Sequence, residues 1–308
     1  MRMMLKAGTS AAVLLTFIVF APGLAKAAAA ADVSDSGCSL NGAVTIGYMF
    51  TDSNFSEIDG NYDWETPFGE AAGLVTCDAW NFQADFASYA HEADIDGKTL
   101  DDTEGHFGGA AFWRDPDAGA FGVSASMINH EFFGKDNDYW RLGAFGEFYV
   151  SDQFTLGGGV HYFTSQDDFF GKDHDGFEFT ANAKFYVMPK LSLSVQGDYM
   201  ISEFDGSGDS SIDGYAVSGE AKYLVFDEGL SLFAGGRYAE RTLGDDDADI
   251  EDLQVYVGLE FAFGGGGGSL AASDRSGKYD NTSVMLEKLP SVFNEIFAAA
   301  CASGGCLP

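Results

Sequence analysis

Histidine is the residue type in this chain best suited to acid–base chemistry. The chain contains five, which are His91, His106, His130, His161 and His174. A serine nucleophile needs such a base within hydrogen-bonding distance. Ser165 follows His161 by four residues, which puts both on one face of a strand but roughly 13 Å apart at about 3.3 Å per residue. The motifs G-x-S-x-G and H-E-x-x-H do not occur. The sequence therefore does not predict an enzyme, although a site assembled from distant strands stays open.

The acidic segment Asp205–Asp209 has the alternating ligand spacing of a calcium-binding EF-hand loop. Ser210 stands where that loop needs a glycine, and Ala216 stands where it needs a bidentate acid. A calcium site is therefore not expected there. The sequence predicts no metal ion and no other cofactor.

Four cysteines permit two disulfides in an exported chain. Cys38 precedes the first expected strand and Cys77 lies at a short turn beside it, so a bond between these two is geometrically plausible. Cys301 and Cys306 could close a small loop near the C-terminus. Four cysteines allow three pairings, so the connectivity stays open.

The strand that the sequence predicts most clearly is the stretch Asp249–Phe263, D-I-E-D-L-Q-V-Y-V-G-L-E-F-A-F. Every second residue from Leu253 to Phe263 is apolar, and the residues between them face the opposite way in a strand. The stretch is longer than an average strand of about five or six residues. A tilted strand of about 9–11 residues crosses a bilayer, so this stretch is long enough to span one.

The end of this stretch resembles the closing strand of bacterial outer-membrane β-barrels of the porin-like type. The resemblance lies in Gly258, Phe261 and Phe263, and it implies that the outer-membrane insertion machinery reads the terminal aromatic residue. It also implies surroundings of membrane lipid and lipopolysaccharide. One departure is the extension 264–308, because such barrels usually end at the closing aromatic.

The first 27 residues are typical of a secretory signal peptide. Arg2 and Lys6 precede the apolar run Ala11–Ala21, and small residues follow up to Ala27. The run is too short to span a membrane, and no later stretch reaches 18 uninterrupted apolar residues. We therefore expect an exported chain.

The composition suits long strands with aromatic belts. The chain has 40 glycines, 28 phenylalanines and 13 tyrosines but only six prolines. Its formal net charge of −32 argues against nucleic acid as a partner.

The sequence predicts twelve strands. The alternating pattern of the second is the least clear, because Pro67 lies within it. They are 41–51, 66–76, 80–91, 104–114, 119–130, 138–150, 153–165, 176–188, 190–202, 214–225, 229–241 and 249–263. Short turns such as Ser151–Asp152 alternate with longer polar links such as Gln166–Asp175. This alternation predicts a closed antiparallel barrel with both ends on the short-turn side. Closure leaves no unpaired edge in lipid.

Charged residues on the polar faces should point into the barrel, because hydrocarbon does not tolerate them. The expected interior residues are Asp85, Arg141, Glu147, His161, Glu178, Lys184, Asp198, Glu220, Lys222, Arg237, Arg241 and Glu260. They could form neutralising pairs that fill the interior, or they could line a narrow aqueous pore and set its selectivity. The pairs expected from register are Glu220 with Arg237, His161 with Glu178, and Arg241 with Asp252. Inward aromatic residues (Phe145, Phe163 and Phe233) would reduce the bore.

The long links are rich in Asp and Glu, most densely at Asp245–Asp249. Such residues could simply keep the loops solvated. They could also create a negative potential that concentrates cations over a Debye length of about 8–10 Å. Both interpretations can hold together.

The C-terminal extension begins with Gly264–Gly268, which is a flexible linker. Val284–Ala300 then has apolar residues near helical spacing, interrupted by Pro290. We expect a short amphipathic or disordered tail. A plug folded into the barrel or a partner-binding helix is the alternative.

The sequence thus predicts a signal peptide at 1–27, an all-β transmembrane barrel of about 12 strands at 28–263, and a C-terminal tail at 264–308, in the bacterial outer membrane. The functional hypothesis is a passive porin-like channel for small hydrophilic solutes that favours cations. The alternative is a non-conducting surface barrel that is structural or binds a partner through its acidic loops.

Overall fold

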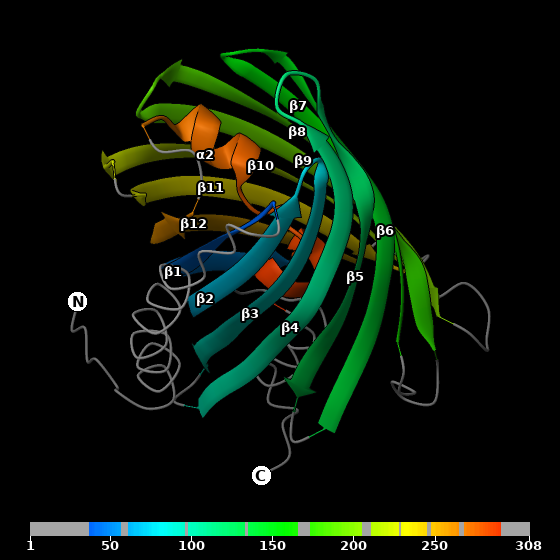
Figure 1. Cartoon of the computed structure of the whole chain (residues 1–308). Coiled ribbons are helices and arrows are strands. Elements are labelled where there is room, and N and C mark those ends of the chain that lie inside the picture. The colour runs from blue at the N-terminus through cyan, green and yellow to red at the C-terminus, as the bar shows by residue number, and fades with distance from the viewer. Residues whose placement is uncertain are drawn as a thin grey trace.

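A computed structural model of the chain describes residues 37–56, 61–95, 98–132, 135–165, 173–204, 211–227, 229–244, 248–264 and 268–290. Its strands form one closed antiparallel barrel of twelve strands (Figure 1). Each strand pairs with its neighbours in sequence, and β1 closes the barrel against β12. The predicted fold class is confirmed.

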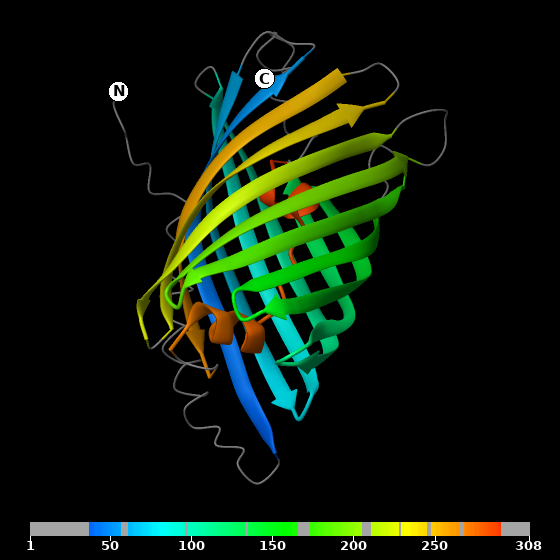
Figure 2. The ribbon, with the colours of Figure 1, turned by 90° about the horizontal axis from the view of Figure 1, so that it is seen from above.

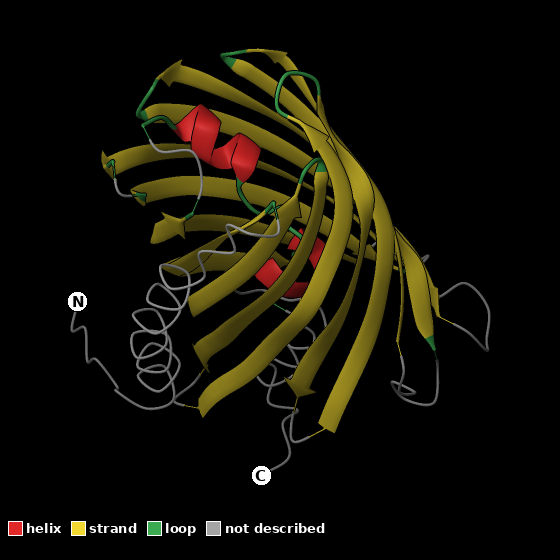
Figure 3. Cartoon of the chain, in the orientation of Figure 1, coloured by secondary structure: helices red, strands yellow, loops and turns green. Residues whose placement is uncertain are grey.

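The strands keep the expected order, and all except β7 are longer than expected. They are β1 (Cys38–Phe55), β2 (Asn61–Cys77), β3 (Trp80–Ile95), β4 (Lys98–Asp115), β5 (Gly119–Phe132), β6 (Lys135–Ser151), β7 (Phe154–Ser165), β8 (His174–Met188), β9 (Leu191–Phe204), β10 (Ile212–Phe226), β11 (Leu230–Leu243) and β12 (Ala248–Phe263). Two short helical elements follow, α2 (Leu270–Ser276) and η1 (Val284–Lys288), and Figure 3 shows both among the strands. Among the described residues, no helix has the length and apolar character needed to cross a membrane.

The outer wall of the barrel is apolar. Alternate residues of the strands leave large hydrophobic side chains exposed, such as Phe121 of β5, Leu142 of β6 and Val255 of β12. A belt of this kind would drive aggregation in water but is what a barrel needs where it meets lipid. The inward and outward faces expected from the alternation are those found, including the buried inward rings of Phe145, Phe163 and Phe233.

The predicted polar links are too long because the strands extend into them, and two links are strand at every described residue. Residues 92–103 were expected as a loop, but β3 and β4 stay paired through Ile95 and Lys98. Residues 131–137 were also expected as a loop, but β5 and β6 stay paired through Phe132 and Lys135. Polar residues on both faces remove the period-two signal, while the backbone hydrogen bonds that define a strand do not depend on it.

The two ends of the barrel differ. At the short-turn end, turns such as 78–79 and 152–153 join the strands, and β1 begins and β12 ends there. Cys38 and Cys77 lie opposite each other in the β1–β2 register at this end and form a disulfide, as the sequence suggested. The opposite end is called the loop end. Cys301 and Cys306 lie outside the described residues.

Candidate functional site

The lumen of the barrel contains the C-terminal segment, defined here as residues 268–290 (Figure 2). The chain turns back after β12 at Gly264, which has a φ of +75°. A Cβ atom at this position would lie 2.1 Å from the carbonyl oxygen of Leu40, so only glycine fits. The sequence favoured a short amphipathic or disordered tail and gave a plug in the barrel or a partner-binding helix as the alternative; residues 268–290 lie inside the barrel, as a plug would.

The segment first docks at the short-turn end through α2. Ser269 caps the helix by accepting a hydrogen bond from the backbone of Ala272 at 3.2 Å. The backbone N–H of Leu270 donates to the carbonyl of Pro189, in the turn between β8 and β9, at 2.8 Å. The Leu270 side chain is buried against Tyr186 and Leu224. These contacts hold α2 against the wall of β8 and β10.

Asp274 is the electrostatic anchor of α2. Its carboxylate lies 2.9 Å from Nζ of Lys184 and 3.5 Å from Nζ of Lys222. Lys222 also binds Glu260 at 2.6 Å. Burial alone would raise the pKa of Asp274, but the two lysines outweigh burial and hold that pKa below its usual range. The sequence had placed Lys184, Lys222 and Glu260 in the interior, without this partner.

The middle of the segment crosses the lumen as an extended chain. Nη1 of Arg114 donates to the carbonyl of Gly277 at 3.0 Å. The backbone of Tyr279 both donates to and accepts from the Gln83 amide, at 2.8 Å in each case. The Tyr279 ring stacks on Phe145 with centroids 3.4 Å apart. Pairing of this backbone by side chains replaces the hydrogen bonds that a sheet would have supplied.

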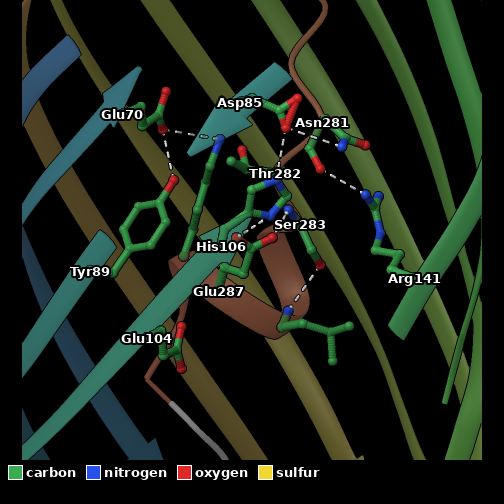
Figure 4. Close-up of polar contacts among 12 residues, drawn as sticks. Glu70, Asp85, Tyr89, Glu104, His106, Arg141, Asn281, Thr282, Ser283 and Glu287 are labelled. Carbon is green, nitrogen blue, oxygen red and sulfur yellow. Dashed lines mark hydrogen bonds and ion pairs between the residues drawn. The ribbon is translucent and has the colours of Figure 1, made fainter. Parts of the chain in front are cut away.

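An arginine–glutamate pair of the wall, Arg141 and Glu178, then binds the segment, and Figure 4 shows the contact of Arg141 with Asn281. Nη2 of Arg141 lies 2.8 Å from Glu178, and Nη1 of Arg141 donates to the carbonyl of Asn281 at 2.8 Å. The hydroxyl of Ser283 donates to the other oxygen of Glu178, also at 2.8 Å. All of these groups are buried. Each hydrogen bond therefore gives a partner to a buried polar atom that would otherwise lower the stability of the fold.

His106 of β4 lies between two carboxylates (Figure 4). Its Nε2 is 3.0 Å from Asp85, and its Nδ1 is 2.9 Å from Glu287 of η1. Both ring nitrogens can donate at once only in the imidazolium form. Glu287 also accepts from the backbone N–H of Ser283 at 2.5 Å. His106 therefore joins η1 to the wall.

Lysines of the segment neutralise a further wall carboxylate. Nζ of Lys278 lies 3.0 Å from Glu70 of β2, which also accepts from the Tyr89 hydroxyl at 2.7 Å. Nζ of Lys288 lies 3.1 Å from Asp280 and 4.0 Å from Glu70. Like-charged lysines are thus separated by carboxylates along the segment.

Toward the loop end the lumen becomes apolar. The apolar ring comprises inward side chains from ten of the strands: Phe55, Tyr62, Trp64, Ala93, Ile128, Tyr139, Phe163, Met200, Ile212, Ala216, Ala239 and Ile250. Val284, Met285, Leu286 and Leu289 of the segment pack inside this ring. Packed hydrocarbon of this kind excludes water.

A cavity of about 290 Å³ remains in the short-turn half of the lumen, beside the segment. Its walls carry six carboxylates and seven lysine or arginine side chains. Of the twelve interior residues predicted from the sequence, eight line this cavity: Arg141, Glu147, His161, Lys184, Glu220, Lys222, Arg237 and Glu260. The remaining four, Asp85, Glu178, Asp198 and Arg241, are also inward and make hydrogen bonds or ion pairs. A role of these twelve in a pore stays a prediction.

The structure forms one of the three expected pairs, Arg241 with Asp252 at 2.5 Å. His161 and Glu178 do lie opposite each other in register. Glu178 nevertheless binds Arg141, and His161 lies 3.2 Å from the Ser124 hydroxyl.

Arg237 donates to Gln254 instead of binding the expected partner Glu220. The residues that the sequence reasoning missed include Glu70 and Arg114, whose partners come from the C-terminal segment. The one available signal was the basic residues Arg275, Lys278 and Lys288 beyond the barrel of an acidic chain.

Hydroxyl–imidazole pairs do occur in the wall. Thr66 lies 2.8 Å from His91, which in turn lies 3.5 Å from Glu104. Thr66 and His91 are 0% and 1% exposed, so this arrangement packs the wall and does not face a substrate space. Ser165 and His161, considered from the sequence, are not brought together, because Ser165 accepts instead from the backbone of His174.

The described residues contain no group of three or more His, Cys, Asp or Glu placed to hold a metal ion. The segment Asp205–Asp209 and the acidic run 245–247 lie outside these residues.

No protein-family model matches the sequence, and no curated protein matches it. Among solved structures, an outer membrane channel from Pseudomonas putida F1 is similar at 12% identity, covering 74% of this chain and 96% of that one with a TM-score of 0.56. The translocator domain of the autotransporter NalP from Neisseria meningitidis has 13% identity, 82% and 99% coverage and a TM-score of 0.45. The outer membrane channel DcaP of Acinetobacter baumannii has 10% identity, 74% and 98% coverage and a TM-score of 0.39.

At 12% identity, the first of these likenesses shows a shared fold. It agrees with the closed barrel and with the apolar outer wall. The chain therefore has the fold of a bacterial outer-membrane β-barrel, and it carries its own C-terminal segment in the lumen.

Proposed function

We propose that the protein is an outer-membrane channel for small hydrophilic solutes, narrowed by its C-terminal segment. The observation that carries this proposal is the polar cavity of about 290 Å³ in the lumen, lined by charged side chains from barrel and segment. Charged walls replace part of the hydration of a polar solute, which is what a selective pore requires. The proposal includes no catalytic step.

The apolar ring controls whether this cavity connects to the loop end. Val284, Met285, Leu286 and Leu289 occupy the lumen at the level of the ring. An apolar constriction stops ions by excluding water. Conduction therefore requires η1 to leave the ring, and the docked arrangement is the closed state.

We assign the preference for cations to the loop end. The cavity walls carry nearly equal numbers of carboxylates and cations, so they create little net potential. The loop end carries exposed carboxylates such as Asp63, Glu65 and Glu251. The sequence that joins β11 to β12 adds the acidic run Asp245–Asp247. A negative mouth raises the local cation concentration within about one Debye length.

A non-conducting surface barrel is the second candidate, and the packing of η1 in the apolar ring favours it. In this case the segment would be a permanent part of the core. The acidic loop end would then serve a structural role or bind a partner.

Single-channel recording of the full chain in planar bilayers at high salt separates the two candidates. Two leucines of the segment, each 1% exposed, make a matched pair of variants. Leu289→Ala loosens η1 in the apolar ring, whereas Leu270→Ala loosens α2 at the short-turn end. We expect openings in the full chain and a higher open probability in Leu289→Ala than in Leu270→Ala. Absence of unitary current in the full chain and both variants would remove the channel proposal.

Reversal potentials at low salt test the cation preference separately. We expect Asp245→Asn with Asp246→Asn to reduce the preference, because the sequence between β11 and β12 supplies both charges. The control is Asp117→Asn with Asp152→Asn, which removes two exposed charges from short turns. Equal permeability of cations and anions in the unmodified protein would remove this part of the proposal alone.

A further inference from the structure

The polar cavity of about 290 Å³ has in its wall a carboxylate and a guanidinium that bind no charged partner among the described residues. They belong to Glu220 of β10 and Arg237 of β11. The lysines that line the same cavity differ, because each of them binds a carboxylate: Lys184, Lys222, Lys278 and Lys288. The cavity therefore keeps one negative and one positive side chain available to a ligand.

Arg237 is held in place by neutral groups. Its side chain is 7% exposed, and its Nε is buried without a hydrogen-bond partner. One of its terminal nitrogens donates to the Gln254 amide, and its guanidinium lies over the ring of Tyr256, 5.6 Å from the centroid. A guanidinium has five N–H donors, and a buried charge without a counter-charge is unfavourable. Donors of Arg237 thus remain for an anionic group in the cavity.

Glu220 and Arg237 are diagonal neighbours on the inner wall. Arg237 lies opposite Ser218 in the β10–β11 register, and Glu220 lies opposite Gly235. Diagonal neighbours across an antiparallel pair are about 7–8 Å apart. Two charge-assisted hydrogen bonds of about 2.8 Å each, one from either side chain, leave room between them for a single small group. A molecule that carries an ammonium and a carboxylate on one carbon matches this spacing.

Aromatic rings lie beside the two charges. A Cβ atom at Gly235 would overlap the Cζ and the hydroxyl of Tyr256, so glycine allows this ring to lie against β11. The ring of Phe233 is 6.4 Å from that of Tyr256 and 6.4 Å from that of Phe68, measured between centroids. All three rings line the cavity. An apolar side chain of a ligand can pack against them.

We infer that the cavity binds a free α-amino acid with an apolar side chain, with the carboxylate on Arg237 and the ammonium on Glu220. The inference rests on the proposed channel, whose solute class it names. A simple cation or anion would leave one of the two side chains without a counter-charge, and an uncharged sugar would leave both. The cavity volume is near the lower end of the about 300–1,000 Å³ of typical ligand pockets, which favours a single amino acid over a peptide.

Calorimetric titration of the full chain in detergent tests the site with three probes. L-leucine carries both charges, isoamylamine is the same molecule without the carboxylate, and isocaproate is the same molecule without the ammonium. We expect leucine to bind about tenfold or more tightly than either analogue, because each lost interaction is a hydrogen bond between charged groups. Leucine binding no tighter than the analogues would overturn the inference, and this comparison needs no variant.

Two variants assign the charges. Glu220→Gln should remove the preference for leucine over isocaproate, and Arg237→Gln should remove the preference for leucine over isoamylamine. Loss of structure would weaken all three probes together, and heat-modifiable migration on gels shows whether each variant is folded. The matched controls are Asp227→Asn and Lys190→Gln, which each remove one charge of a surface ion pair and should keep both preferences. Unchanged preferences in folded Glu220→Gln and Arg237→Gln would also overturn the inference.

The planar-bilayer recordings distinguish failure of this site from failure of the channel. Unitary current in the full chain without preferential binding of leucine would overturn the inference and leave the channel proposal standing. Preferential binding of leucine without unitary current would support the site and remove the channel proposal.

Discussion

The ring of Tyr279 lies parallel to the ring of Phe145, with 3.4 Å between centroids and 5° between planes. One ring belongs to the C-terminal segment and the other to β6, so this contact joins two parts of the chain that are far apart in sequence. Gln83 holds the Tyr279 backbone with two hydrogen bonds of 2.8 Å. The stack therefore forms only when the middle of the C-terminal segment is docked against β6.

Replacing Tyr279 by alanine should weaken docking. Loss of the aromatic pair and of its buried area should cost about 1–3 kcal/mol, because the ring is only partly buried. Limited proteolysis in detergent should then cut within residues 268–290 faster than in the unmodified protein. Tyr279→Phe keeps the ring and should keep the protection. Equal cleavage of the alanine and phenylalanine variants would contradict a stabilising role for the stack.

Replacing Asp274 by asparagine should release α2 from the wall. Lys222 would keep Glu260 as a partner, whereas Lys184 would lose its ion pair with the segment. Breaking a largely buried pair should cost roughly 3 kcal/mol. Trypsin cleavage after Arg275 measures the release. Asp227→Asn is the control, because Asp227 pairs with Lys190 on the surface and its loss should cost less than about 1 kcal/mol. Similar cleavage of both variants would argue against the anchor.

Docking of α2 should be insensitive to mild acid. Burial opposes ionisation of Asp274, but Lys184 and Lys222 outweigh it and the pKa of Asp274 is lowered. A lowered pKa in the folded protein means that the stabilisation is present above the ordinary value of about 3.9 and is lost only as the pH falls through the lowered value. Hydrogen exchange of residues 270–276 should therefore stay constant from about pH 8 to about pH 4, after correction for the intrinsic rate. Loss of protection between about pH 6 and pH 5 would refute this account.

Replacing Gly264 by alanine should disturb the point where the chain enters the lumen. The residue has a φ of +75°, and a Cβ there would lie 2.1 Å from the carbonyl oxygen of Leu40. Strain of about 1–3 kcal/mol should appear as a lower melting temperature and less protection of the segment. Gly73→Ala is the matched control, because a Cβ at Gly73 meets nothing within 4 Å. The explanation fails if the two alanine variants melt alike.

The strands and their faces could be predicted from the sequence because their signal is local. In β12, the alternation from Leu253 to Phe263 marks the lipid side, since a strand places successive side chains on opposite faces. Antiparallel closure followed from the requirement that no strand edge is left unpaired in lipid. The position of Cys38 and Cys77 at the ends of neighbouring strands followed in turn.

The ends of the strands at the loop side could not be predicted in this way. Residues 92–103 carry polar side chains on both faces, and only the pairing of β3 with β4 shows that they are strand. The ion-pair partners of the side chains inside the barrel could not be predicted from the sequence either. Glu178 faces His161 in register but binds Arg141, because the longer arginine side chain reaches its carboxylate with two hydrogen bonds.

The sequence by itself determined that the chain is a barrel with an apolar outside and a charged inside, because hydrophobic periodicity acts over neighbouring residues. Only the tertiary structure decided what fills the inside. The apolar residues from Val284 to Leu289 would suit a free amphipathic turn as well as a plug. They become a plug because the ring that receives them is assembled from ten strands, and no local pattern in the C-terminal segment encodes that ring.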